Sequence, residues 1–270
     1  MRINLVNRMA ASSFKVESGI QLIARLTKKL TNIKFYPHLF PSGLKPGEVI
    51  ELIHNEDMPI CLITDIICTA LLPTNLGGAE SGVLIFNCSG NFNFSKLVTS
   101  MRQKIKSYTK TLDEMEVDDL ITKQFNNLFV VDIHDATQFY TTIYNLENVL
   151  LEHTNITMVM FDNIAAFYWS EQGFKIMKID TYLKKVLSKI QNVTKEHKVI
   201  VLYSKPHYFN SSKDAMDSLE ACYELPSLDG VNYRISVSYD RDSIYLANVK
   251  SYNMQQEKRF CINEEQVTWI

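Results

Sequence analysis

The feature that most constrains the fold is an alternation of short apolar strands with helical patterns between residues 47 and 202. The expected strands are Gly47–Ile53, Val83–Phe86, Leu128–Val131, Thr157–Phe161 and Val199–Leu202. The expected helices between them are Ile60–Leu72, Phe94–Tyr108, Phe139–Leu150 and Ile176–Val193. A strand that is apolar at every position is typical of a sheet covered on both faces. The alternation therefore predicts an α/β fold with a mostly parallel central sheet and helices on both faces.

The C-terminal part has a different pattern. Ile235, Val237 and Tyr239 alternate with serines, and a polar turn at residues 240–243 leads into Ile244–Val249. This pattern predicts a C-terminal antiparallel hairpin at the edge of the sheet. Residues 204–234 lack a clear period and are long for a connector, which indicates a mobile or a functional segment. We expect a helical lead-in and linker over residues 1–45 and one core domain over residues 46–270.

Composition excludes several classes of protein. The 270 residues are 46% hydrophobic and 21% charged, enough apolar material for a sizeable core. The 28 basic and 30 acidic side chains give a net charge of −2, unlike a protein that coats nucleic acid with cations. Five cysteines without a C-x-x-C pair indicate reduced thiols in the cytosol or nucleus, and no metal site. The longest apolar run, residues 59–73, is too short to cross a bilayer, so we expect no membrane association.

A strand, a turn and a buried helix, with a later strand ending at Asp162, are typical of a nucleotide-binding core. In such a core the first turn is rich in glycine, a lysine reaches the outer phosphates, and a serine or threonine holds magnesium. None of these residue types is present in the turn of this chain. It consists of His54, Asn55, Glu56, Asp57, Met58, Pro59, Ile60 and Cys61.

The acidic residues of this turn oppose phosphate binding. Glu56 and Asp57 would each repel a phosphate by about 3 kcal/mol at ~5 Å and an effective dielectric constant of ~20. The chain has no lysine or arginine between Lys45 and Lys96 that could compensate for them locally. We therefore predict that ATP does not bind in the usual way. The alternative is an ordinary helix start, with Asp57 as N-cap and Pro59 in the first turn, that was never a phosphate site.

Four segments together resemble one family. They are residues 16–26 (V-E-S-G-I-Q-L-I-A-R-L), the strand at Gly47–Ile53, the Leu71–Gly78 stretch (L-L-P-T-N-L-G-G) and Met160–Trp169 (M-F-D-N-I-A-A-F-Y-W). In this order the chain resembles the eukaryotic RecA-type recombinase paralogues over roughly residues 16–204. The resemblance implies a RecA-like ATPase core in the nucleus, within a paralogue complex that supports homologous recombination and double-strand-break repair. The setting, somatic repair or meiotic recombination, stays open.

The resemblance also implies partners and site residues. The nearest partner would be another RecA-like paralogue, with a recombinase filament and single-stranded DNA further downstream. Asp162 matches the Walker B aspartate that orients magnesium through water, although it could instead be a turn residue at a strand end. The position of the catalytic glutamate falls near Ser89, which cannot act as a general base unaided. The polar sensor falls near Ser204–Pro206 without a clear match.

Because most of the catalytic parts are absent, we expect a non-catalytic subunit that needs no cofactor. The alternative is an atypical DNA-dependent ATPase that binds ATP and magnesium in a site completed by a partner subunit. The two hypotheses differ in the role of Asp162. In the non-catalytic subunit it is a remnant of the Walker B aspartate, and in the ATPase it orients magnesium.

Two further segments are candidate interaction sites. The first interleaves basic and aromatic residues, and the matching loop of RecA-like folds faces single-stranded DNA. Its members are Lys205, His207, Tyr208, Phe209 and Lys213. Several acids follow closely, so a solvated connector is the alternative. The second segment is Phe167–Trp169, whose aromatic side chains suit either the core or a protein interface.

Overall fold

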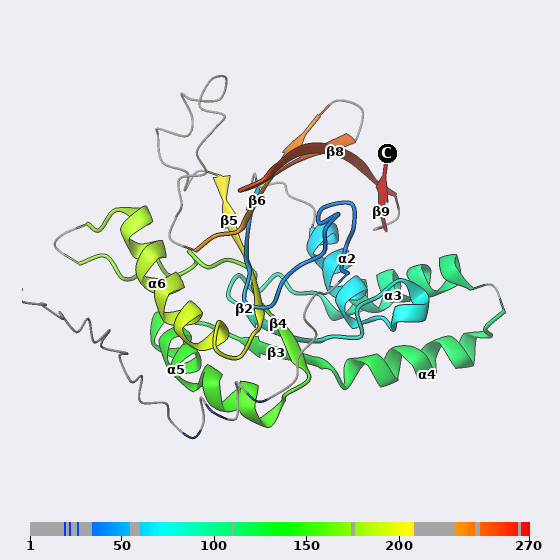
Figure 1. Cartoon of the computed structure of the whole chain (residues 1–270), viewed down its shortest axis with the longest axis horizontal. Coiled ribbons are helices and arrows are strands. Elements are labelled where there is room, and N and C mark those ends of the chain that lie inside the picture. Colours follow the sequence, from blue (N-terminus) through cyan, green and yellow to red (C-terminus); the bar gives the residue numbers. More distant parts are fainter. Residues whose placement is uncertain are drawn as a thin grey trace, which may run out of the picture.

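The computed structural model describes residues 34–54, 60–109, 111–173, 176–207, 230–240, 244–263 and 266–270, together with residues 19, 22 and 26. Within these residues the backbone forms a nine-stranded sheet in the order β3-β2-β4-β5-β1-β6-β7-β8-β9, with helices packed on it (Figure 1). None of the described helices is both long and apolar enough to cross a membrane.

The first six strands run parallel to one another. They are β1 (Val49–His54), β2 (Gly82–Asn87), β3 (Leu128–Asp132), β4 (Ile156–Phe161), β5 (Ile200–Pro206) and β6 (Tyr233–Tyr239). The last three extend the sheet beyond β6, and each runs antiparallel to the strand before it. They are β7 (Ile244–Ser251), β8 (Met254–Asn263) and β9 (Gln266–Trp269). The expected mixed α/β, RecA-like architecture is confirmed, and the antiparallel part extends beyond the expected hairpin by two strands.

Helices cover both faces of the sheet. One face packs against α2 (Ile60–Leu71), α3 (Phe94–Tyr108) and α4 (Glu114–Phe125). The other packs against α5 (Ala136–Glu152) and α6 (Ile179–Thr194). Successive strand residues point to opposite faces, so Ile50 and Leu52 join the first core while Val49 joins the second. This two-sided burial explains why the central strands are apolar at nearly every position.

The helix starts follow local capping chemistry. Asn93 caps α3 as expected, because its side chain accepts from the Lys96 N–H at 3.0 Å. Asp135 likewise accepts from the Gln138 N–H at 2.8 Å, but the Gln138 side chain reaches back to the N–H of His134, not of Asp135. A helix that we did not predict, α4, begins with a complete capping box.

The segment before β1 belongs to the core. Phe35, Leu39, Phe40 and Leu44 are each at most 2% exposed and pack in the same cluster as α2 and the C-terminal strands. The Phe40 ring lies 5.1 Å from that of Tyr233. This part of the expected linker therefore contributes to folding. Of the helical lead-in, the structure describes Gly19, Leu22 and Leu26, all of them helical.

Candidate functional site

The carboxyl ends of the parallel strands gather the residues that the sequence singled out. His54 ends β1, Asn87 ends β2, Asp162 follows β4 and Lys205 lies near the end of β5. Ligands of open α/β sheets bind outside these carboxyl ends. This edge is therefore the candidate functional site.

Asp162 is tied to the turn that leaves β2. Its Oδ1 accepts from the backbone N–H groups of Cys88 at 2.6 Å and Ser89 at 3.0 Å, and its Oδ2 accepts from the Ser89 hydroxyl. Its own N–H donates to the Phe86 carbonyl at 3.2 Å. Burial raises the pKa of Asp162 above its usual value, and the bonds from Ser89 and Cys88 oppose that rise only in part. Both carboxylate oxygens thus already accept hydrogen bonds from within the chain.

The polar groups around Asp162 also bond to one another. The Ser204 hydroxyl donates to the Asp162 carbonyl, and the Ser204 carbonyl accepts from the Ile164 N–H at 3.1 Å. On the next strand, the Asn87 amide donates to Asp132 at 2.6 Å. Ser204 and Asn87 therefore hold the carboxyl ends of the strands to the segments beside them.

A buried ion cluster that sequence analysis missed lies in the centre of the sheet. Glu51 of β1 is fully buried and pairs with Lys205 of β5, whose Nζ lies 2.9 Å from Oε1. The Tyr203 hydroxyl donates to the same oxygen at 2.9 Å, and the Arg234 guanidinium pairs with the other. The signal available in the sequence was a single carboxylate inside an apolar strand, since such a group needs a partner when buried.

The charges of this cluster compensate one another. Burial alone would raise the pKa of Glu51, but Lys205 and Arg234 hold it below its usual value of 4.5. The Lys205 side chain is only 3% exposed. Lys205 therefore acts as an internal counter-ion in β5, not as part of an open loop.

The other predicted site residues are only partly covered. Asn55, Glu56, Asp57, Met58 and Pro59 of the turn lie outside the described residues, as do Tyr208, Phe209 and Lys213 of the expected DNA loop. Ile60 and Cys61 open α2, and His207 is exposed directly after β5. The support for the prediction that this turn does not bind ATP is therefore its residue composition.

The aromatic triplet after Asp162 is only partly buried in the core. Phe167 is 8% exposed and lies 5.6 Å from Phe139, and Tyr168 is 5% exposed and donates to the Met177 carbonyl at 2.5 Å. Trp169, in contrast, is 63% exposed. The first two residues belong to the core, and the third faces solvent.

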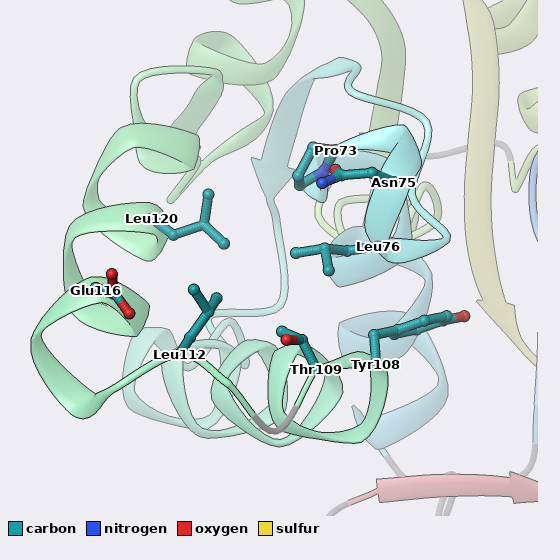
Figure 2. Close-up of a pocket in the computed structure, with 8 residues that line it drawn as sticks. All are labelled: Pro73, Asn75, Leu76, Tyr108, Thr109, Leu112, Glu116 and Leu120. Atoms are coloured by element: carbon teal, nitrogen blue, oxygen red, sulfur yellow. The ribbon is translucent and has the colours of Figure 1, made fainter.

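A hollow of about 460 Å³ lies between the segment that follows α2, the end of α3 and the start of α4 (Figure 2). Leu76, Leu112 and Leu120 point into it, and Glu116 lies at its rim (Figure 2). The Glu116 carboxylate already accepts from the Asp113 N–H at 3.0 Å in the capping box of α4. This hollow brings together no set of catalytic side chains.

We expect Asp162→Ala to lower the free energy of unfolding by about 1–3 kcal/mol, because it leaves the Cys88 and Ser89 N–H groups without their acceptor. Urea denaturation followed by circular dichroism measures this loss. Asp119→Ala, at an exposed position of α4, is the matched control and should change stability by less than about 0.5 kcal/mol. Equal stability of the two variants would show that the carboxylate does not hold the β2 turn.

No model of a known protein family matches this chain. Among the described residues there is also no group of three or more histidine, cysteine or acidic side chains arranged to hold a metal ion. The carboxyl-end site and the resemblance of the sequence segments are therefore the features of this chain that bear on its function.

Proposed function

We propose that this chain is a non-catalytic RecA-like subunit of a recombinase-paralogue complex that supports homologous recombination and double-strand-break repair in the nucleus. The observation that carries the proposal is the set of hydrogen bonds made by Asp162. Its two carboxylate oxygens accept three hydrogen bonds from the turn that leaves β2. An aspartate that orients magnesium needs its oxygens directed toward the ion and its water. In this chain the same oxygens accept hydrogen bonds that hold the turn after β2.

Two further observations support a core without nucleotide chemistry. Ser89 occupies the position that the resemblance gives to the catalytic base, and its hydroxyl is bonded to Asp162. Lys205 and Arg234 are paired with Glu51 inside the sheet, so they are not available to a phosphate unless that cluster breaks. Together with the acidic turn at residues 54–61, these pairings favour a subunit that needs neither ATP nor magnesium.

A RecA-like core of this kind can still act by binding. Subunits with this fold stack so that one covers the nucleotide site of the next, and a subunit without nucleotide would end such a stack or join it from one side. Its direct partner would be another RecA-like paralogue, and its effect on the recombinase filament and single-stranded DNA would be indirect.

Titration of the chain with labelled ATP and magnesium tests the proposal. We expect no binding in the micromolar range, while a RecA-type recombinase with an intact phosphate loop binds under the same conditions. Micromolar affinity would contradict the proposal.

Hydrolysis assays then separate the adaptor from the alternative ATPase. The rate of ATP hydrolysis by the complex of this chain with its paralogue should be the same for the wild-type chain and for Asp162→Ala. A loss of activity in the Asp162→Ala complex, with the complex itself intact by size-exclusion chromatography, would instead assign the chain to an ATPase whose site is completed by its partner.

A further inference from the structure

The outer surface of the first three turns of α5 is unusual because it is exposed and carries no charge. No acidic or basic side chain occurs from Ala136 to Leu146. The hydroxyls of Thr141 and Thr142 each donate at 2.8 Å to a carbonyl of their own helix, so they are engaged within α5. A shallow hollow of about 450 Å³ lies here, lined by Thr141, Thr142, Tyr144 and Asn145.

The Tyr144 side chain lines this hollow and is held in one orientation by contacts with α6. Tyr144 is 74% exposed. The Lys189 amine of α6 lies 5.2 Å from the centre of its ring and 3.4 Å from its hydroxyl. The same amine lies 4.6 Å from the ring of Tyr140, one turn earlier on α5. Holding an exposed ring in one orientation reduces the entropy lost when a partner binds.

The opposite side of the molecule is an ordinary solvent-facing surface. There the exposed faces of α3 and α4 are coated with paired charges, among them Arg102 with Asp118 and Lys106 with Glu114. The centres of protein interfaces are depleted in charged residues and enriched in tyrosine and tryptophan. Both surfaces expose aromatic side chains, Tyr144 on α5 and Phe94 and Tyr108 on α3, but only the first three turns of α5 also lack charged residues.

The neighbouring helix supplies a positive rim. α5 and α6 pack side by side (Figure 1), and Lys185 and Lys189 are exposed one turn apart on α6. Two acids border this network and are engaged within the chain. Glu171 accepts from the hydroxyls of Tyr140 at 3.0 Å and Tyr182 at 3.1 Å, and Glu147 lies 3.8 Å from the His197 ring nitrogen. An uncharged centre beside two lysines is complementary to a partner that carries apolar and acidic groups together.

We propose that the α5–α6 face binds a protein segment that places a bulky apolar side chain against Tyr144 and carboxylates against Lys185 and Lys189. A single-stranded nucleic acid is a less suitable occupant, because α5 has no lysine or arginine to offer its phosphates further cations. The surface does not involve the carboxyl-end site, so this inference is independent of whether ATP binds.

Selection of random twelve-residue peptides on the full chain tests the inference. We expect the enriched peptides to combine aspartate or glutamate with phenylalanine, leucine or tryptophan. The affinity of the best peptide should fall at least about tenfold with Tyr144→Ala and with Lys185→Glu, and should persist with Lys185→Arg. Lys123→Glu, at an exposed position of α4, is the control for a general charge effect and should change nothing.

Other outcomes would overturn the inference. Enrichment of peptides without acids, or equal binding by the Tyr144→Ala and wild-type chains at equal melting temperature, would show that this face is not the proposed site. Tighter binding of a twenty-residue oligothymidine that is lost with Lys185→Glu would make the face a nucleic-acid site instead. None of these results changes the outcome of the ATP titration, so failure here and failure of the adaptor proposal are distinguishable.

Discussion

Replacing Glu51 with glutamine is expected to lower the free energy of unfolding by about 3–5 kcal/mol, because the change removes one partner of a buried ion pair and leaves its counter-ions unpaired. The side chain of Glu51 is 0% exposed, and those of Lys205 and Arg234 are 3% and 13% exposed. Urea denaturation of the two purified chains measures the difference. A loss below about 1 kcal/mol would contradict the assignment of Glu51 as the central counter-ion.

Two control variants isolate the charge effect. Glu48→Gln, just before β1, removes a carboxylate that accepts from the Lys45 N–H at 2.8 Å, and should cost less than about 1 kcal/mol. The double variant Glu51→Gln with Lys205→Met should be less destabilised than Glu51→Gln alone, because it also removes one of the two unpaired cations.

The effect of Glu51 should also depend on pH. Lys205 and Arg234 hold its pKa below the usual value of 4.5, so the folded state favours the ionised carboxylate. The resulting stabilisation is fully present above pH 4.5 and is lost as the pH falls through the lower pKa of the folded state. The stability difference between wild type and Glu51→Gln should therefore be constant near neutral pH and narrow below about pH 4.5. A stability difference between wild type and Glu51→Gln that increases below pH 4.5 would contradict a lowered pKa of Glu51 in the folded state.

Phe161→Ala should destabilise the protein by about 3–5 kcal/mol, because it opens a cavity in the core between the sheet and α5. The Phe161 ring is fully buried, and its centre lies 4.4 Å from that of Phe86 and 6.0 Å from that of Phe139. Phe161 also precedes Asp162, so hydrogen exchange at the Cys88 and Ser89 amides should become faster in the variant. Denaturant unfolding and exchange mass spectrometry measure these two effects.

Phe94→Ala is the matched control for this variant. Phe94 is 50% exposed, and its ring centre lies 4.6 Å from that of Phe125 at the surface of α3 and α4. Its replacement removes the same atoms from a site that water can fill, and should cost about 1 kcal/mol. Equal losses for Phe94→Ala and Phe161→Ala would show that burial at β4 does not control stability.

The elements that sequence analysis missed have weak local patterns. β8 alternates partly buried and exposed residues, and its exposed positions Gln255, Glu257 and Arg259 leave little apolar signal. The helix α4 has a weak apolar stripe, but its Asp113 and Glu116 capping box could have been read from the sequence. Strands covered on both faces, such as Leu84–Phe86, were predictable because every position has to be apolar.

Local sequence was sufficient for strands β1 to β7 and helices α2, α3, α5 and α6, for the caps at Asn93 and Asp135, and for the acidic, lysine-free turn after β1. Each of these depends on neighbouring residues. The tertiary structure alone showed that Glu51 pairs with Arg234, 183 positions away, and that Asp162 closes on Ser89, 73 positions away. Residues so far apart meet only because β1 lies between β5 and β6, and β4 beside β2. This strand order is an outcome of packing the whole chain, and no local pattern records it.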